Sequence, residues 1–329
     1  MGSCGVNIRY AISYRDQVMS KALELTFAVE LDQPIRYIER TRSYYLGLGY
    51  ENPYIWAHYI EVPFTPLQKP LNQSVIGLIT TAVPYDPAKG PQGPGAPYNA
   101  TAKFYQPYQN PLDTDLDLRI AHVGIDRQNA NMEDSDCWFP FAAAKQAVQS
   151  GRVKALSPNF YGLPTNRSQR HTLEIDAPLI LEMLRVDKVD VAVLIPNCPI
   201  CHQSQSLLAR YLEAKGISTV IMGAAKDIVE YCGVPRFLFS DFPLGNAVAK
   251  PYDPSSQVLN FELALRLLES AFMPRTTVQS PLIWSADPSW KLDYSNLERL
   301  SAQEISRLSK EAEQARITAR ELRVKSVGS

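Results

Sequence analysis

Residues 189–216, VDVAVLIPNCPICHQSQSLLARYLEAKG, predict a strand, a turn and a helix in direct succession. The run VDVAVLI (189–195) is apolar apart from Asp190 and rich in β-branched residues, which is typical of a strand buried on both faces of a sheet. Residues 201–214 have apolar side chains at the helical period, and the helix is predicted to stop at Gly216. The run ISTVIM (217–222) predicts the next strand. This order predicts a mainly parallel sheet covered by helices.

Other segments extend this α/β pattern in both directions. Three apolar runs predict strands, namely VIGLITTA (75–82), LRIAHV (118–123) and RFLFSD (236–241). Residues 257–272 predict another helix. The fold class is therefore α/β, with a Rossmann-like, mainly parallel sheet. The similar runs VIGLITTAVP and VAVLIPNCP leave open a division into two lobes.

The regions outside this pattern divide the chain into three parts. Helices expected at 14–30 and 34–48 predict a helical N-terminal arm over residues 1–70, where the aromatic run YIWAHY indicates a docking face. Residues 71–275 are the expected catalytic region. Within it, residues 84–111 hold seven prolines and three glycines, which favours a loop or a lid. Residues 276–329 form a C-terminal tail.

The tail contains a predicted helix at 301–324. Its apolar positions alternate at spacings of three and four, which is the pattern of a coiled-coil contact. Three of these positions are alanine, and a weak contact of this kind fits packing against the chain's own domain. Self-association into a homodimer through this helix is the alternative.

Composition excludes several classes of function. The 329 residues carry 33 Lys and Arg against 34 Asp and Glu, a net charge of −1, so we expect neither nucleic acid nor an anionic membrane as a partner. No uncharged apolar span reaches about 18 residues, and no signal peptide is evident. Five cysteines, an odd number and few for a chain of this length, indicate reduced thiols instead of a disulfide framework. We therefore expect a cytoplasmic protein that acts on a small molecule.

Ligands of open parallel sheets bind at the carboxyl ends of the strands, and this rule selects candidate residues. The predicted substrate-binding residues follow three of the predicted strands and are Thr80, Thr81, Asp126, Arg127 and Asn197. Arg127 and Arg167 are also candidates for clamping a substrate carboxylate.

The turn IPNCPICHQ brings two thiols and an imidazole together. With Pro199 at the first helical position, Cys198 becomes the N-cap and faces the unpaired amides of the helix. The helix dipole stabilises a thiolate there by at most about 1 kcal/mol, so Cys201 or His202 must contribute as well. Cys198 is the predicted nucleophile and Cys201 its helper. His202 and His122 are the candidates for proton transfer.

The spacing Cys198-x-x-Cys201 has other interpretations. A structural zinc site needs two more ligands, whereas Cys137, Cys232 and His171 are scattered singly. A thioredoxin-like disulfide exchanger and inert buried cysteines also fit. No metal or other cofactor is expected, and the glycines of residues 90–95 match no nucleotide-binding motif. A catalytic metal held by Cys198, His122 and a carboxylate is left open.

Residues from Pro34 to Ala271 resemble the selenoprotein B family of glycine, sarcosine, betaine and proline reductases, specifically its cysteine-containing relatives. The stretches that carry the resemblance are PIRYIERTRSYY, WAHYIEVPFTPL, RIAHVGIDRQ, FYGLP, IPNCPICHQ and FSDFPLG. The resemblance implies that Cys198 takes the selenocysteine position of the motif Sec-x-x-Cys-x-x-Cys. Cys201 then takes the first cysteine position, and Ser204 replaces the second.

The resemblance implies an enzyme that cleaves a carbon–heteroatom bond. In the reductases the selenolate is understood to attack a carbon that bears an activated amine, and partner subunits resolve the adduct. Here sulfur replaces selenium and one cysteine is lost, which favours non-redox chemistry. The leading prediction is hydrolytic desulfurisation of a cyclic thione of the thiohydantoin type, with release of hydrogen sulfide. The alternatives are a thiol-dependent reductase of the parental type and a non-catalytic scaffold subunit.

Overall fold

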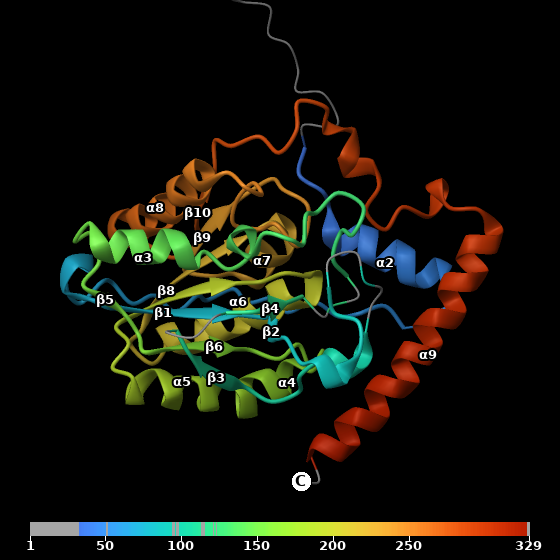
Figure 1. Cartoon of the computed structure of the whole chain (residues 1–329), viewed down its shortest axis with the longest axis horizontal. Coiled ribbons are helices and arrows are strands. Elements are labelled where there is room, and N and C mark those ends of the chain that lie inside the picture. The colour runs from blue at the N-terminus through green and yellow to red at the C-terminus, as the bar shows by residue number, and fades with distance from the viewer. Residues whose placement is uncertain are drawn as a thin grey trace, which may run out of the picture. The chain divides into compact units, whose positions relative to one another are not determined.

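The computed structural model describes residues 33–50, 52–93, 96, 99–112, 116–120, 122 and 124–327 (Figure 1). The helix expected at 14–30 lies outside these residues. The chain divides into two units after Gln33, and residues 34–329 form one compact unit that contains the whole α/β region. A division of the α/β region into two lobes is therefore not seen in the described chain.

The main sheet has eight strands, and all of its neighbouring strands are parallel except β3 and β6. Their order is β10-β9-β8-β7-β1-β6-β3, and β5 pairs with β1. The strands are β1 (Val75–Thr80), β3 (Tyr108–Pro111), β5 (Ala155–Leu156), β6 (Asn159–Gly162), β7 (Val191–Ile195), β8 (Ser218–Gly223), β9 (Arg236–Phe239) and β10 (Thr276–Gln279). The predicted α/β class with a mainly parallel sheet is confirmed.

Helices cover both faces of this sheet (Figure 1). One face packs against α3 (Phe141–Gln149) and α8 (Pro254–Ser270), and the other against α5 (Ala177–Val186) and α6 (Pro199–Glu213). The other helices are α2 (Tyr37–Gly47), the short α4 (Gln169–His171), which continues into a π-helical turn at Thr172–Asp176, α7 (Lys226–Cys232) and α9 (Ala302–Val327). Among the described helices, none is both long and apolar enough to cross a bilayer.

The two central strands are buried because both faces are covered. All five residues of β7 are buried, as the uncharged, β-branched run predicted. In β1, a Cβ atom at Gly77 would lie 3.1–3.2 Å from side chains of Leu184, Val189 and Tyr161. Glycine therefore lets α5 and the neighbouring strand approach β1 closely.

The adjacent strands β1 and β7 mark the point where the strand order reverses. From β1 the chain continues to β5 and β6 on one side, whereas from β7 it continues to β8, β9 and β10 on the other. The connections that leave the carboxyl ends of β1 and β7 therefore diverge. Such a reversal point is the usual ligand site of an open parallel sheet.

Three sequence expectations need correction. Of the strand expected at 118–123, the described residues form β4 (Leu118–Arg119), which pairs with β2 (Val83–Pro84) outside the main sheet. Ile120 and His122 are not part of a strand, and His122 contacts the loop after β1. In the expected helical arm, α2 is the described α-helix, and no helix or strand is assigned to the described residues of 52–70. Residues 84–111 are not all loop, because they end in the edge strand β3, where a proline is tolerated.

A buried ion pair fastens the strap, which we define as residues 53–70, to the sheet. Arg236 Nη1 of β9 donates to Glu213 Oε1 at 2.8 Å, and both side chains are fully buried. The Thr65 amide also donates to Glu213, and Arg236 Nη2 donates to the Thr65 carbonyl at 2.9 Å. The backbone amide of Thr219 completes the coordination of the carboxylate at 2.6 Å. One hydrogen-bond network thus joins the strap to the end of α6 and to strands β8 and β9.

This network predicts a large cost for removing one partner. Arg236→Ala should lower the free energy of unfolding by about 3–5 kcal/mol, because Glu213 would remain buried without its cation. The matched control is Arg266→Ala, whose side chain is 70% exposed in its pair with Glu262 and should cost about 1 kcal/mol or less. Urea denaturation of both variants measures the difference. Equal costs would show that the buried pair does not fasten the strap.

Candidate functional site

Cys198 lies at the carboxyl end of β7 and is the N-cap of the 15-residue helix α6. Its backbone is extended, with φ −127° and ψ 172°, and its Sγ accepts a hydrogen bond from the Cys201 amide at 3.2 Å. Pro199 occupies the first helical turn and so removes one amide that would lack a partner. The predicted N-cap is confirmed, and negative charge on this sulfur is favoured.

The two cysteines of the turn are within bonding distance. The structure pairs Cys198 with Cys201 as a disulfide, with Cα atoms 4.9 Å apart, whereas the sequence predicted reduced thiols. The first turn of a helix brings positions three residues apart close enough for this bond. Among the described residues, Cys137 and Cys232 are unbonded and buried. Cys201 is fully buried and Cys198 is 5% exposed, so Cys198 is the more accessible residue of the pair.

His202 is completely buried and both of its ring nitrogens contact backbone. Nε2 accepts from the amides of Ala224 and Ala225 at 2.9 and 3.1 Å, so the ring proton belongs on Nδ1, which donates to the Cys198 carbonyl at 2.8 Å. Burial lowers the pKa of His202 to about 4, and the ring is neutral near pH 7. A Cβ atom at Gly223 would lie 2.9 Å from this ring, which explains the glycine. The predicted role in proton transfer remains a prediction.

His122 lies close to the cysteine pair and comes from the segment that follows β4. Its Nε2 donates to the Thr81 carbonyl at 2.7 Å, so Nδ1 carries the lone pair and lies 3.5 Å from the Thr165 hydroxyl. Burial lowers the pKa of His122 to about 4. One ligand atom each of His122, Cys198 and Cys201 lie within 4.8 Å of one another. This group could hold a metal ion. The sequence left open a metal held by Cys198, His122 and a carboxylate, and in the structure Cys201 takes the place of the carboxylate.

The predicted residues of the two central strand ends do meet. Asn197 Nδ2 donates to Thr81 Oγ1 at 3.1 Å, which joins the ends of β7 and β1. The buried Asn197 Oδ1 has no hydrogen-bond partner among the described residues. Thr80 turns its hydroxyl towards the Ala82 amide at 3.0 Å and thereby shapes the loop after β1. Asn197 therefore offers an acceptor beside the cysteine turn.

Asp126 and Arg127 lie in the loop that carries His122. The Asp126 carboxylate accepts from the amide and side chain of Asn129 at 3.2 Å, and burial raises its pKa. Arg127 Nη2 donates to the His122 carbonyl at 2.8 Å, and its Nε donates to the Ala96 carbonyl at 3.3 Å. Arg127 thus holds the backbone of His122 in place through the hydrogen bond to its carbonyl.

Cys198 opens into a pocket of about 610 Å³, which we call the thiol pocket. Its walls combine aromatic rings with four arginines and two aspartates, Asp126 and Asp293. The excess of cationic side chains suits a small anionic molecule that has an apolar part. The aromatic residues are Tyr44, Tyr45, Tyr50, Tyr54, Trp56 and Tyr294, and the arginines are Arg42, Arg127, Arg167 and Arg307.

The sequence did not predict most of this wall. Tyr54 and Trp56 belong to the run YIWAHY, which was expected to be a docking face, and Arg307 comes from the start of α9. These segments lie more than about a hundred residues from Cys198 in the chain, so no local pattern connects them with it. The aromatic density of residues 44–59 was the available signal.

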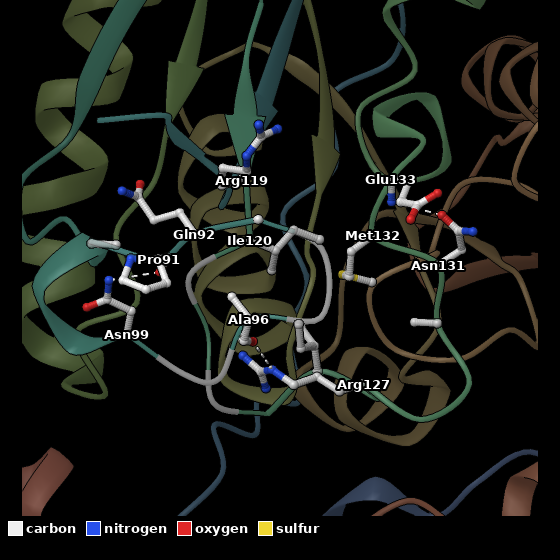
Figure 2. Close-up of a pocket in the computed structure, with 14 residues that line it drawn as sticks. Pro91, Gln92, Ala96, Asn99, Arg119, Ile120, Arg127, Asn131, Met132 and Glu133 are labelled. Atoms are coloured by element: carbon white, nitrogen blue, oxygen red, sulfur yellow. Dashed lines mark hydrogen bonds between the residues drawn. The ribbon is translucent and has the colours of Figure 1, made fainter. Parts of the chain in front are cut away.

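A second pocket of about 310 Å³ lies beyond the loop of His122 and shares Ile125 and Arg127 with the thiol pocket. Figure 2 shows Ile120, Met132 and Arg127 around it, with Arg127 bonded to Ala96. Ile120, Ile125 and Met132 also pack against the two cysteines. Apolar side chains therefore shield the cysteine pair from this pocket.

The comparisons support a distant relation to a reductase. The chain is 27% identical over 201 residues to the D-proline reductase subunit gamma of Acetoanaerobium sticklandii, an alignment that covers 59% of this chain and 78% of that protein. The chain is thus a distant homologue of a reductase subunit. No family model and no solved structure matches the chain.

The two buried histidines predict a pH-dependent stability. Both have pKa values lowered from 6.5 to about 4 by burial, so the unfolded chain binds protons more readily. The contribution of the two neutral histidines to the free energy of unfolding is complete above about pH 6.5 and is lost as the pH falls towards about 4. Between about pH 7 and about pH 5, each should cost about 2 kcal/mol of unfolding free energy.

The variant His202→Gln isolates this effect, because glutamine offers both a donor and an acceptor but does not titrate. Its loss of stability between the two pH values should be smaller by about 2 kcal/mol than that of the wild type. His58→Gln is the matched control, since this histidine is exposed. An unchanged pH dependence in His202→Gln would contradict a buried neutral imidazole.

Proposed function

We propose that this protein is a dithiol-dependent reductase that cleaves a carbon–heteroatom bond of a small carboxylate. The observation that carries the proposal is the arrangement of the cysteine pair. Cys198 lies on the wall of the thiol pocket, and Cys201 lies within bonding distance behind it. The distant relation to a reductase subunit supports the same class of reaction.

In the first step, Cys198 acts as the nucleophile. Its thiolate attacks the carbon next to the carboxylate, a carbon–sulfur bond forms, and the heteroatom leaves with the bonding electrons and takes up a proton. The Cys201 amide and the end of α6 stabilise the thiolate before the attack. The hydrogen bond is seen in the disulfide form, and the same amide is placed to donate to the Cys198 thiolate after reduction.

In the second step, Cys201 resolves the adduct. Its thiolate attacks Cys198 Sγ, the sulfur–sulfur bond forms, and the carbon–sulfur bond breaks. The electron pair passes to the substrate carbon, which takes a proton from solvent. The substrate gains two electrons and the cysteine pair loses two. An external dithiol must then reduce the disulfide before the next turnover.

The arginines of the thiol pocket support a carboxylate substrate. The Arg167 guanidinium lies over the Tyr45 ring, 6.0 Å from its centroid, and no hydrogen bond to another described residue is assigned to it. Its backbone is held at φ 51°, in the left-handed region, and its carbonyl accepts from the Tyr54 hydroxyl at 3.1 Å. A residue held in this way presents its cation to the pocket without competing partners. Arg127, in contrast, already binds two carbonyls.

Hydrolytic desulfurisation, the leading expectation from the sequence, lacks such support. It also needs Cys198, but it gives no role to a second thiol at bonding distance. The relation to a reductase subunit favours the alternative that the sequence left open. The two reactions differ in their use of electrons, and this difference allows a direct test.

Thiol counting after a single turnover separates the two reactions. Pre-reduced enzyme, freed of reductant, is mixed with D-proline and a panel of small carboxylates and cyclic thiones, and its thiols are counted after product forms. A reductase loses two thiols per product, and Cys201→Ser should stop at a covalent adduct on Cys198. Cys198→Ser should be inactive. Full recovery of both thiols, with oxygen from water in the product, would instead establish hydrolysis.

Charge-selective alkylation tests the role of Arg167. Iodoacetate is an anion and iodoacetamide is its neutral counterpart. The ratio of their alkylation rates at Cys198 therefore reports how strongly the pocket attracts a carboxylate. Arg167→Gln should lower this ratio about tenfold, the effect of losing one charged hydrogen bond. Arg170→Gln is the matched control, because Arg170 pairs with Glu174 outside the pocket lining. A ratio that is the same in both variants would remove Arg167 from substrate binding.

A further inference from the structure

We propose that Cys198, Cys201 and His122, when the two thiols are reduced, form a binding site for Zn²⁺. The inference requires reducible thiols and does not rest on reductase activity. Cys198 and Cys201 belong to the start of α6, His122 comes from a loop far away in the chain, and all three residues are buried. The site is therefore a product of the fold and is not a feature of the Cys-x-x-Cys turn alone.

The spacing of the ligand atoms suits a tetrahedral ion. Zinc binds sulfur at about 2.3 Å and nitrogen at about 2.0–2.1 Å, which places two sulfurs and one nitrogen about 3.5–3.8 Å apart. The ligand atoms of His122, Cys198 and Cys201 already lie within 4.8 Å of one another. Reduction breaks the sulfur–sulfur bond and lets the two sulfurs separate. Rotation of side chains then suffices to complete the geometry.

The surroundings of His122 resemble those of a metal-binding histidine. Such histidines donate their second ring N–H to a carbonyl or a carboxylate, which fixes the tautomer and directs the lone pair at the metal. His122 Nε2 makes this hydrogen bond with the Thr81 carbonyl. Among the described residues, the hydrogen-bonding contact assigned to Nδ1 is the long one of 3.5 Å with the Thr165 hydroxyl. Coordination would therefore replace a weak interaction with a strong one.

The donor set selects zinc among common divalent ions. Two thiolates and one imidazole are soft and borderline ligands, which suit Zn²⁺ and disfavour Mg²⁺ and Ca²⁺. Binding exchanges two thiol protons for one ion, so the two thiolates and Zn²⁺ together carry no net charge. This neutrality matters in a buried site, where two thiolates alone would be costly.

The same sulfurs cannot hold zinc and form a disulfide. A disulfide leaves His122 as the one remaining ligand of the three, so the oxidised chain should not retain the ion. With three protein ligands among the described residues, the fourth position is left for water or for a molecule in the thiol pocket. Bound zinc would thus hold the cysteine pair in its reduced form and keep it from acting as a dithiol.

Cobalt titration of the full, reduced chain tests the site. One equivalent of Co²⁺ should produce thiolate-to-cobalt charge-transfer and tetrahedral visible bands, and one equivalent of Zn²⁺ should abolish them. Cys201→Ser and His122→Asn should bind at least about tenfold more weakly, whereas the control Cys232→Ser should match the wild type. Protein oxidised with diamide should show no bands. Absent bands in the reduced wild type, or equal affinity in His122→Asn, would overturn the proposal.

Alkylation of the wild type provides a readout that does not depend on folded variants. Zn²⁺ should slow the labelling of Cys198 and Cys201 at least about tenfold, as mapped by mass spectrometry, and should leave Cys137 and Cys232 unchanged. Equal labelling with and without zinc would count against the site. Zinc binding without loss of two thiols per turnover would remove the reductase and leave this inference intact. Loss of two thiols per turnover without zinc binding would support the reductase and remove the zinc site.

Discussion

The buried imidazole of His202 is the connection on which the site depends. It donates to the carbonyl of Cys198 and accepts from the amides of Ala224 and Ala225, so it joins the turn after β7 to the turn after β8. One neutral ring provides the acceptor for two buried backbone amides and a second donor for the Cys198 carbonyl, which also accepts from the His202 amide at 3.0 Å. The ring leaves no room for a side chain at position 223. Through this contact, the position of the thiol is determined by the sheet and not by the turn alone.

The turn held in this way combines several properties in four residues. Cys198 caps α6, faces the thiol pocket and receives the amide of Cys201, while the sulfur of Cys201 lies behind it. His122 reaches the same sulfurs from the loop that begins near β4. The three groups therefore have two mutually exclusive arrangements, a disulfide and a metal-bound dithiolate. Both follow from the same close packing, and the redox state of the thiols decides between them.

Distant segments build the pocket around this turn. The strap supplies Tyr54 and Trp56, and residues 293–308 supply Tyr294 and Arg307. The strap is fastened at its far end by the buried pair of Glu213 and Arg236, which also joins β8 and β9. The wall that would bind a substrate thus depends on a polar network at the opposite end of the strap. Arg167, held in a left-handed conformation, adds a cation to the same wall.

The sequence by itself determined the α/β class, the strand–turn–helix around residues 189–216 and the N-cap position of Cys198. These features arise from local periodicity and helix-end chemistry, which depend on neighbouring residues only. The tertiary structure alone decided the short strands β6 and β10, the bonding partners of His202, the approach of His122 and the aromatic wall of the thiol pocket. Each of these depends on contacts between segments far apart in the chain, and a single sequence does not display such contacts. The sequence does not distinguish a histidine that packs in the core from a catalytic one, because the difference lies in the atoms that surround the ring.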